Sequence, residues 1–79
     1  MTPHILVVDD DPQVRQLIAD YLGTQDYRVS AAADGGEMTR LLAESAVDLI
    51  VLDLKLPGED GLSLARKLRA ESDIPIIML

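Results

Sequence analysis

The chain has 79 residues, a formal net charge of −7, 48% apolar residues and no cysteine. This length allows one domain, and the apolar fraction excludes a disordered segment. The excess of acid argues against direct nucleic-acid binding by this segment, and the absence of cysteine excludes disulfides and thiolate metal sites. No apolar run approaches the ~20 residues that span a bilayer, and the amino terminus lacks the basic start of a secretory signal, so we expect a cytoplasmic domain without membrane contact.

The first predicted element is a strand, because residues 4–8 (His-Ile-Leu-Val-Val) form a continuous apolar run. His4 at its start is expected at the surface or at a strand edge. Three consecutive carboxylates follow at Asp9–Asp11, and the last of them precedes Pro12, which is typical of a helix N-cap with proline in the first helical position. Apolar residues then recur at helical spacing until Gly23, which predicts the end of that helix.

A second strand and helix are predicted next along the chain. Residues 27–33 favour a weaker strand. Asp34 is placed to cap the following helix, and Glu37 three residues later resembles the second half of a capping box. The apolar side of this helix is formed by Met38, Leu41 and Leu42.

The last part of the chain predicts a strand, a loop, a helix and a further strand. Residues 47–54 form another apolar run, which carries a carboxylate near its end at Asp53. The following segment is a loop by its proline and glycine content, and residues 62–72 then predict a helix. Its inner side is expected to carry Leu62, Ala65 and Leu68, flanked by Leu64. Residues 74–79 predict the fourth strand.

The alternation of strands and helices predicts an α/β fold with a doubly wound parallel sheet. In such sheets the ligand site lies beyond the carboxyl ends of the strands, where the strand order reverses. Asp9, Asp10 and Asp53 all lie at such ends. If the first and third strands are neighbours, these three carboxylates converge on one crevice.

Three carboxylates within a few ångströms repel one another, and a divalent cation removes that penalty. Oxygen ligands without nearby histidine or cysteine suit a hard ion, and Mg²⁺ is the expected cofactor. Asp11 is expected to cap the helix instead of binding metal. Each acidic strand end is unremarkable alone, since helix caps are often aspartates. The combination of two such ends in this topology favours a metal site.

At this point the chain resembles the receiver domain of bacterial two-component response regulators. The resemblance runs from "ILVVDDDP" through "ADGGE" and "DLIVLDLKLPGEDG" to "IPIIML", and the block Asp-x-x-x-Pro-x-x-Asp-Gly from Asp53 to Gly61 is its most specific part. It implies a flavodoxin-like receiver fold. Residues 1–79 would then form the amino-terminal portion of a single receiver domain, with three strand–helix units and one further strand.

The resemblance also implies a role for each matching residue. Asp53 would accept a phosphoryl group from a histidine kinase or phosphotransfer protein. Asp9, Asp10, Asp53 and the backbone carbonyl of Lys55 would hold Mg²⁺, and Pro57 and Gly61 would shape the loop and start the third helix. The domain would assist its own phosphorylation and dephosphorylation without being a conventional enzyme.

The sequence departs from the family pattern at its end. Leu79 is the last residue, one position before the Ser or Thr that the family carries after its fourth strand. The family's fifth-strand lysine and most of its output surface have no counterpart here, so we expect a fragment whose signalling is impaired. An open edge at residues 74–79 would favour a homodimer or other self-association.

Two other classes of function stay open at this stage. One is an interaction or dimerisation module whose acidic site does not function. The other is an enzyme related to the aspartyl-phosphate phosphohydrolases, which would need a second acid two residues after the nucleophile, where Lys55 stands. A P-loop is absent from the sequence.

Overall fold

The computed structural model describes residues 2–56, 58 and 60–79. In chain order its elements are β1 (His4–Val8), α1 (Pro12–Thr24), β2 (Arg28–Ala32), α2 (Gly35–Glu44), β3 (Leu49–Leu52), α3 (Gly61–Glu71) and β4 (Ile76–Met78). All strand pairs are parallel, and the sheet has the order β2-β1-β3-β4. The predicted doubly wound α/β fold is therefore confirmed, and the strand order reverses between β1 and β3.

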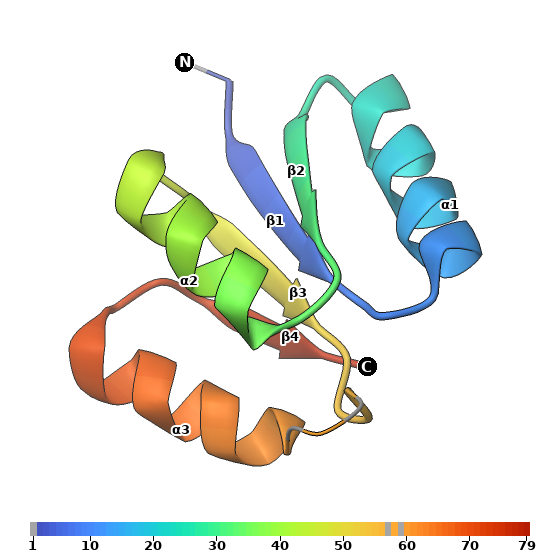
Figure 1. Ribbon diagram of the computed structural model, residues 1–79. Helices are drawn as coiled ribbons and strands as arrows, with labels where there is room; N and C mark the ends of the chain where they lie inside the picture. Colours follow the sequence, from blue (N-terminus) through green and yellow to red (C-terminus); the bar gives the residue numbers. More distant parts are fainter. Residues whose placement is uncertain (1, 57, 59) are drawn as a thin grey trace.

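The helices cover the two faces of this sheet unequally, with α1 on one face and α2 and α3 on the other (Figure 1). The loops after β1 and β3 leave the sheet at the same end, where the arrowheads of the strands point (Figure 1). This end of the sheet is where the predicted acidic site belongs.

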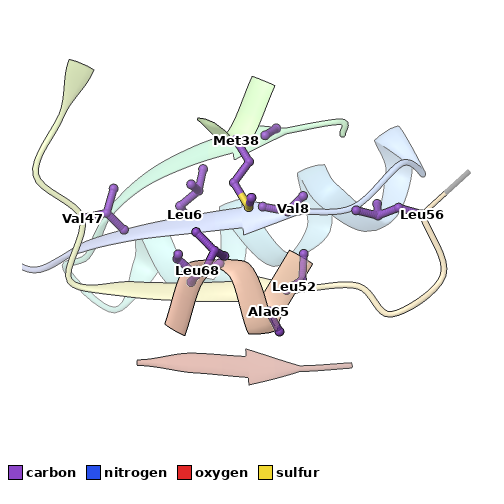
Figure 2. Close-up of a cluster of buried hydrophobic side chains, with 10 residues drawn as sticks. Leu6, Val8, Met38, Val47, Leu52, Leu56, Ala65 and Leu68 are labelled. Atoms are coloured by element: carbon purple, nitrogen blue, oxygen red, sulfur yellow. The ribbon is translucent and has the colours of Figure 1, made fainter. Parts of the chain in front are cut away.

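The main hydrophobic core lies between the sheet and the pair α2 and α3. Figure 2 shows Met38 of α2 and Leu68 of α3 on either side of Leu6 and Val8 of β1. Leu6 and Leu52 are fully buried, and Met38 is only 1% exposed, so the core is aliphatic and closely covered. Met38 is confirmed as a core residue.

The face under α1 is less complete. Ile5 and Val7 of β1 point away from the main core by strand alternation and are buried. No residue of α1 itself is buried, however, and Leu17 and Tyr21 are 70% and 65% exposed. The predicted apolar spacing is present in α1, but much of that stripe faces solvent. Each helix in the described part of the chain is too short or too polar to cross a bilayer.

Several element boundaries differ from the prediction. The first helix passes through Gly23 and ends at Thr24, and the left-handed backbone conformation that follows is adopted by Asp26, with φ 64°. The strands β3 and β4 are shorter than the apolar runs that predicted them, and residues just beyond their ends still make single backbone bonds to the neighbouring strand. Leu62, expected inside, is 42% exposed, while its neighbour Leu64 packs against the core.

The expectation that His4 lies at the surface is wrong, since only 3% of the residue is exposed. Its ring Nδ1 donates to the carbonyl of Ala46 at 2.8 Å, because a carbonyl oxygen can only accept. The ring Nε2 lies 2.7 Å from the Ser30 hydroxyl, which can donate to it or accept from it. Its backbone N–H donates to Asp48 at 2.8 Å. These bonds satisfy a polar side chain that would otherwise be costly to bury.

Candidate functional site

The register of the sheet brings the carboxyl ends of β1 and β3 side by side. Val8 pairs with Leu52, so the residues that follow them, Asp9 and Asp53, leave the sheet at the same level. The N–H of Asp53 donates to the carbonyl of Val8 at 2.9 Å, and the N–H of Asp9 donates to the carbonyl of Ala32 at 3.1 Å. Both aspartates are therefore anchored to neighbouring strands through their backbone.

The side chains of Asp9, Asp10 and Asp53 form one cluster. Each offers a carboxylate oxygen, and the three oxygens all lie within 4.8 Å of one another. Asp9 is the most enclosed, with 8% of the residue exposed, Asp53 is half-buried and Asp10 is exposed. The structure thus brings together the three carboxylates that the sequence placed at strand ends.

The electrostatics of this cluster are unfavourable for three negative charges. Burial raises the pKa of the Asp9 carboxyl above its ordinary value, and the negative charges of Asp53, Asp10 and Asp11 raise it further. The Asp11 N–H, which donates to Asp9 Oδ1 at 3.0 Å, acts in the opposite direction. The upward direction means that the fold without a cation penalises the charged form of Asp9.

Asp11 has the separate role that was predicted for it. Its Oδ1 accepts the N–H of Gln13 at 2.9 Å and that of Val14 at 3.4 Å, and Pro12 stands at the start of α1. These bonds satisfy amide groups at the helix end that have no partner within the helix. Asp11 is therefore confirmed as the N-cap, and its side chain lies outside the cluster.

The loop after β3 closes on the acidic end of the sheet. The N–H of Lys55 donates to Asp53 Oδ1 at 3.0 Å, which orients the Asp53 carboxylate. Gly61 begins α3 directly against this loop, and a Cβ there would lie 2.6 Å from Leu54 Cα and 2.7 Å from the Asp53 carbonyl. The position therefore requires glycine, while the predicted role of Pro57 lies outside the described residues.

Arg15 also contacts the acidic loop, although no sequence motif pointed to this residue. Its Nη1 donates to the carbonyl of Asp9 at 2.9 Å and lies 3.5 Å from the carbonyl of Asp10. The available signal was a basic residue one turn after the cap at Asp11, which is meaningful only once that turn is known to face the acidic loop.

The donor set fits Mg²⁺. This ion binds oxygen ligands at about 2.0–2.1 Å in octahedral geometry, so its ligand oxygens lie about 3 to 4 Å apart. Three carboxylate oxygens within 4.8 Å reach that spacing after small movements of their side chains. Two of the carboxylates, those of Asp9 and Asp53, are already oriented by backbone N–H groups.

Fold and site together define a flavodoxin-like α/β domain with an acidic site at its topological switch point. The chain matches the family model of the response regulator receiver domain over residues 5–79. It therefore belongs to the response regulator receiver domain family of two-component systems, and the family resemblance found in the sequence is confirmed.

Individual relatives agree with this membership. The regulatory protein VirG of Agrobacterium tumefaciens is 49% identical over 76 residues, which are 96% of this chain and 28% of VirG. Thus the chain spans less than a third of that relative. The crystal structure of the receiver domain of the response regulator TorR superposes with a TM-score of 0.91 at 38% identity, covering 96% of this chain and 63% of that one. The response regulator TrrA of Thermotoga maritima, solved with Mg²⁺ and BeF, gives 0.90 at 33% identity, with 98% and 68% covered.

Proposed function

We propose that Asp53 is the phospho-acceptor of this receiver domain and that Asp9 and Asp10 complete its Mg²⁺ site. The observation that carries the proposal is the cluster of three carboxylate oxygens within 4.8 Å at the switch point of the sheet. The chain's place in the receiver family supplies the reaction class, because receiver domains are signalling modules that receive phosphoryl groups from histidine kinases or phosphotransfer proteins.

Asp53 is suited to attack because its two oxygens have different surroundings. Oδ1 accepts the N–H of Lys55, which fixes the plane of the carboxylate. The other oxygen is then the nucleophile that attacks phosphorus in line, forming an acyl phosphate while the bond to the donor's imidazole nitrogen breaks. Because Asp53 is half-buried, the phosphoryl group arrives from the solvent side of the crevice.

Asp9, Asp10 and Asp53 would hold Mg²⁺ together with the backbone carbonyl of Lys55. When bound, the ion neutralises negative charge on the phosphoryl oxygens. Receiver domains bind Mg²⁺ at an acidic pocket, and the TrrA structure named above was solved with it. The raised pKa of Asp9 supports the assignment, because a cation relieves the penalty on its charged form.

Phosphorylation tests the acceptor. The chain is treated with a small phosphodonor and Mg²⁺, reduced with borohydride and mapped by mass spectrometry. We expect one modified residue, Asp53, and no modification in Asp53→Asn. Asp60→Asn is the matched control, because Asp60 is a nearby helix cap that should not accept phosphate. Modification at a residue other than Asp53 would refute the assignment.

Thermal unfolding tests the metal site. Mg²⁺ that binds only the folded chain stabilises it by mass action, by about 2.7 kcal/mol at 100 times the dissociation constant. We expect this stabilisation in the unmodified chain and its loss in Asp10→Asn. Asp73→Asn removes the same charge from an exposed position and should respond as the unmodified chain does. An equal response of all three chains would place the ion elsewhere.

We further propose the setting in which this site works. Residues 1–79 are the amino-terminal portion of a single receiver domain, in agreement with the 63% to 68% of the solved relatives that they cover. The phosphoryl donor is a histidine kinase or phosphotransfer protein, and the reaction takes place in the cytoplasm.

The alternative function as an aspartyl-phosphate phosphohydrolase is disfavoured by Lys55. Such an enzyme needs an acid two residues after the nucleophile, where Lys55 stands.

Self-association of the 79-residue chain is a second proposal, and it rests on β4. This strand lies at one edge of the sheet, with backbone groups available to pair with another strand. Ile77 and Leu79 are 49% and 60% exposed beside that edge. A second copy that pairs along β4 would cover both the backbone and these side chains, giving a symmetric dimer.

A further inference from the structure

Arg15 occupies an electrostatically unusual place in the fold. It is the fourth residue of α1, in the first turn, where the aligned peptide dipoles of a helix leave a partial positive charge. A cation is disfavoured at this end of a helix, and anionic residues are favoured. The position therefore needs a compensating interaction, and the acidic loop directly before the helix provides one.

The contacts of Arg15 go to the backbone of the acidic loop. Its Nη1 donates to the carbonyl of Asp9 at 2.9 Å, with a longer approach to the carbonyl of Asp10 at 3.5 Å. Neither bond uses a carboxylate oxygen. The guanidinium thus places positive charge beside the cluster without occupying the oxygens that a cation would need.

Arg15 completes the set of bonds that fixes Asp9. The N–H of Asp9 is held by the carbonyl of Ala32 at 3.1 Å, and its Oδ1 is held by the N–H of Asp11 at 3.0 Å. The carbonyl of Asp9 is held by Arg15. With its N–H, its carbonyl and one carboxylate oxygen bonded, the residue has one direction left for its second carboxylate oxygen.

We propose that Arg15 is a positioning residue of the acidic site. Through the carbonyl of Asp9 it holds the loop between β1 and α1 in the conformation that aims Asp9 and Asp10 at the crevice. The proposal deepens the proposed function and rests on it where Mg²⁺ is concerned. The holding of the loop itself does not depend on the metal, which allows the two to be tested separately.

A role through charge alone and a role in positioning the loop predict opposite changes in Mg²⁺ affinity when Arg15 is replaced. If the guanidinium acted only through its charge, Arg15→Met would remove a repulsion and Mg²⁺ would bind more tightly. If Arg15 positions the loop, the same variant binds Mg²⁺ more weakly, by about 10-fold, which is at the low end for residues that orient metal ligands. Arg15→Lys keeps the charge and can donate to one carbonyl, so it should restore part of the affinity.

The experiment combines Mg²⁺ titration followed by NMR with solvent exchange of the Asp11 amide measured without metal. Since this amide donates to Asp9 Oδ1, a loosened loop exposes it, and we expect faster exchange in Arg15→Met. Arg28→Met is the matched control, because Arg28 is exposed at the start of β2, at the opposite end of the sheet from the acidic site. It removes the same charge from the chain and should change neither measurement.

Each outcome decides the question. Weaker Mg²⁺ binding and faster Asp11 exchange in Arg15→Met, with partial recovery in Arg15→Lys, support the positioning role. Unchanged or tighter binding with unchanged exchange, or effects equal to those of Arg28→Met, overturn it. If the unmodified chain does not bind Mg²⁺, the proposed metal site fails, and the exchange of Asp11 alone decides whether Arg15 holds the loop. Should Arg15→Met not fold, the two measurements on Arg15→Lys are decisive, with unchanged values overturning the role.

Discussion

The two faces of the sheet differ in how completely their helices cover them. Under α2 and α3, the strand residues Leu6, Ile50 and Leu52 are fully buried. On the α1 side, Ile5 and Val7 are buried, but Ile77 and Leu79 at the β4 edge are 49% and 60% exposed. The helix itself contributes no buried residue. The same sheet therefore has one face with a fully buried centre and one face that is more open to solvent.

This difference indicates where stability and function reside. Burying an aliphatic side chain fully contributes about 1.5–3 kcal/mol, so most of the folding free energy must come from the α2 and α3 face. The acidic site lies at the end of β1 and β3, the central strands that both faces share. Its geometry thus depends on the well-packed face, while its contact with Arg15 comes from the other.

The largest expected loss in the free energy of unfolding is that of Gly61→Ala, at the start of α3. A Cβ at this position would meet backbone atoms of Leu54 and Asp53 at 2.6 to 2.8 Å, and backbone cannot move aside cheaply. We expect a loss of about 1–3 kcal/mol or more in the free energy of unfolding. Gly23→Ala, in α1 with no atom within 4 Å of the new Cβ, should instead gain about 0.5–1 kcal/mol. Urea unfolding measures both, and equal effects of the two changes would contradict the contrast.

A smaller and more direct comparison uses two isoleucines. Ile50→Val removes one methylene from the fully buried face and should cost about 0.5–1.5 kcal/mol. Ile77→Val makes the same change where 49% of the residue is exposed. It should lower the free energy of unfolding by at most about 0.5 kcal/mol. Thermal and urea unfolding of both variants check this difference. Comparable losses would show that the α1 side is covered in solution, for example by a second copy.

The pH dependence of stability tests Asp9, which lies at the carboxyl end of β1, where the two faces of the sheet meet. Because its pKa in the fold is raised above 3.8, the folded chain binds this proton more tightly than the unfolded chain does. The contribution of Asp9 to the free energy of unfolding should therefore fall as pH rises from below 3.8 through the folded pKa. Asp9→Asn keeps an oxygen for the Asp11 N–H but removes the charge. Without metal it should match the unmodified chain at low pH, after a constant offset, and become relatively more stable as pH rises.

Unfolding curves between pH 3 and pH 7, in buffer free of divalent ions, check this expectation. Asp73→Asn, which lies outside the cluster, serves as the control. A stability difference for Asp9→Asn that does not change with pH would mean that Asp9 is not penalised in its charged form. Addition of Mg²⁺ should reverse the order of stability, because only the unmodified chain gains the ion.

The last comparison concerns association instead of the stability of the monomer, and it uses Ile77→Lys, which alters a half-exposed residue of β4. Its effect should appear in the molecular mass. If a second copy pairs along β4, a charge there opposes the association, and light scattering after size exclusion should shift from dimer toward monomer. Leu17→Lys, at an exposed position of α1, is the control for added charge. A monomeric unmodified chain at tens of micromolar, with no change in Ile77→Lys, would refute the dimer.

Much of the fold was predictable because its signals are local. The apolar run of β1, the cap at Asp11 and the cap at Asp34 each depend on residues adjacent in sequence, and the structure confirms all three. Asp34 accepts the N–H of Glu37 at 2.8 Å, as the capping pattern predicted. The convergence of the carboxylates also followed, since parallel strand order fixes which ends meet.

The errors arise where burial depends on distant parts of the chain. Leu62 has the right periodicity for the core but lies at the exposed start of α3, while Leu64 takes the inner place. Leu17 and Tyr21 are apolar at helical spacing, yet burial depends on how much of the sheet lies beneath α1. The role of Arg15 depends on the path of the loop, which no local pattern specifies.

His4 gives the molecule a built-in spectroscopic reporter. It is the single histidine of the chain, so its imidazole resonances are free of overlap. The ring is held by Ala46 and Ser30 at the amino-terminal end of β1, opposite the acidic site. The carbonyl of Ala46 requires a proton on Nδ1, and the nitrogen chemical shift of Nδ1 reports on that bond. In titrations with Mg²⁺ or a phosphodonor, an unchanged His4 signal would mark a local event at the site, and a changed one would mark rearrangement of the whole sheet.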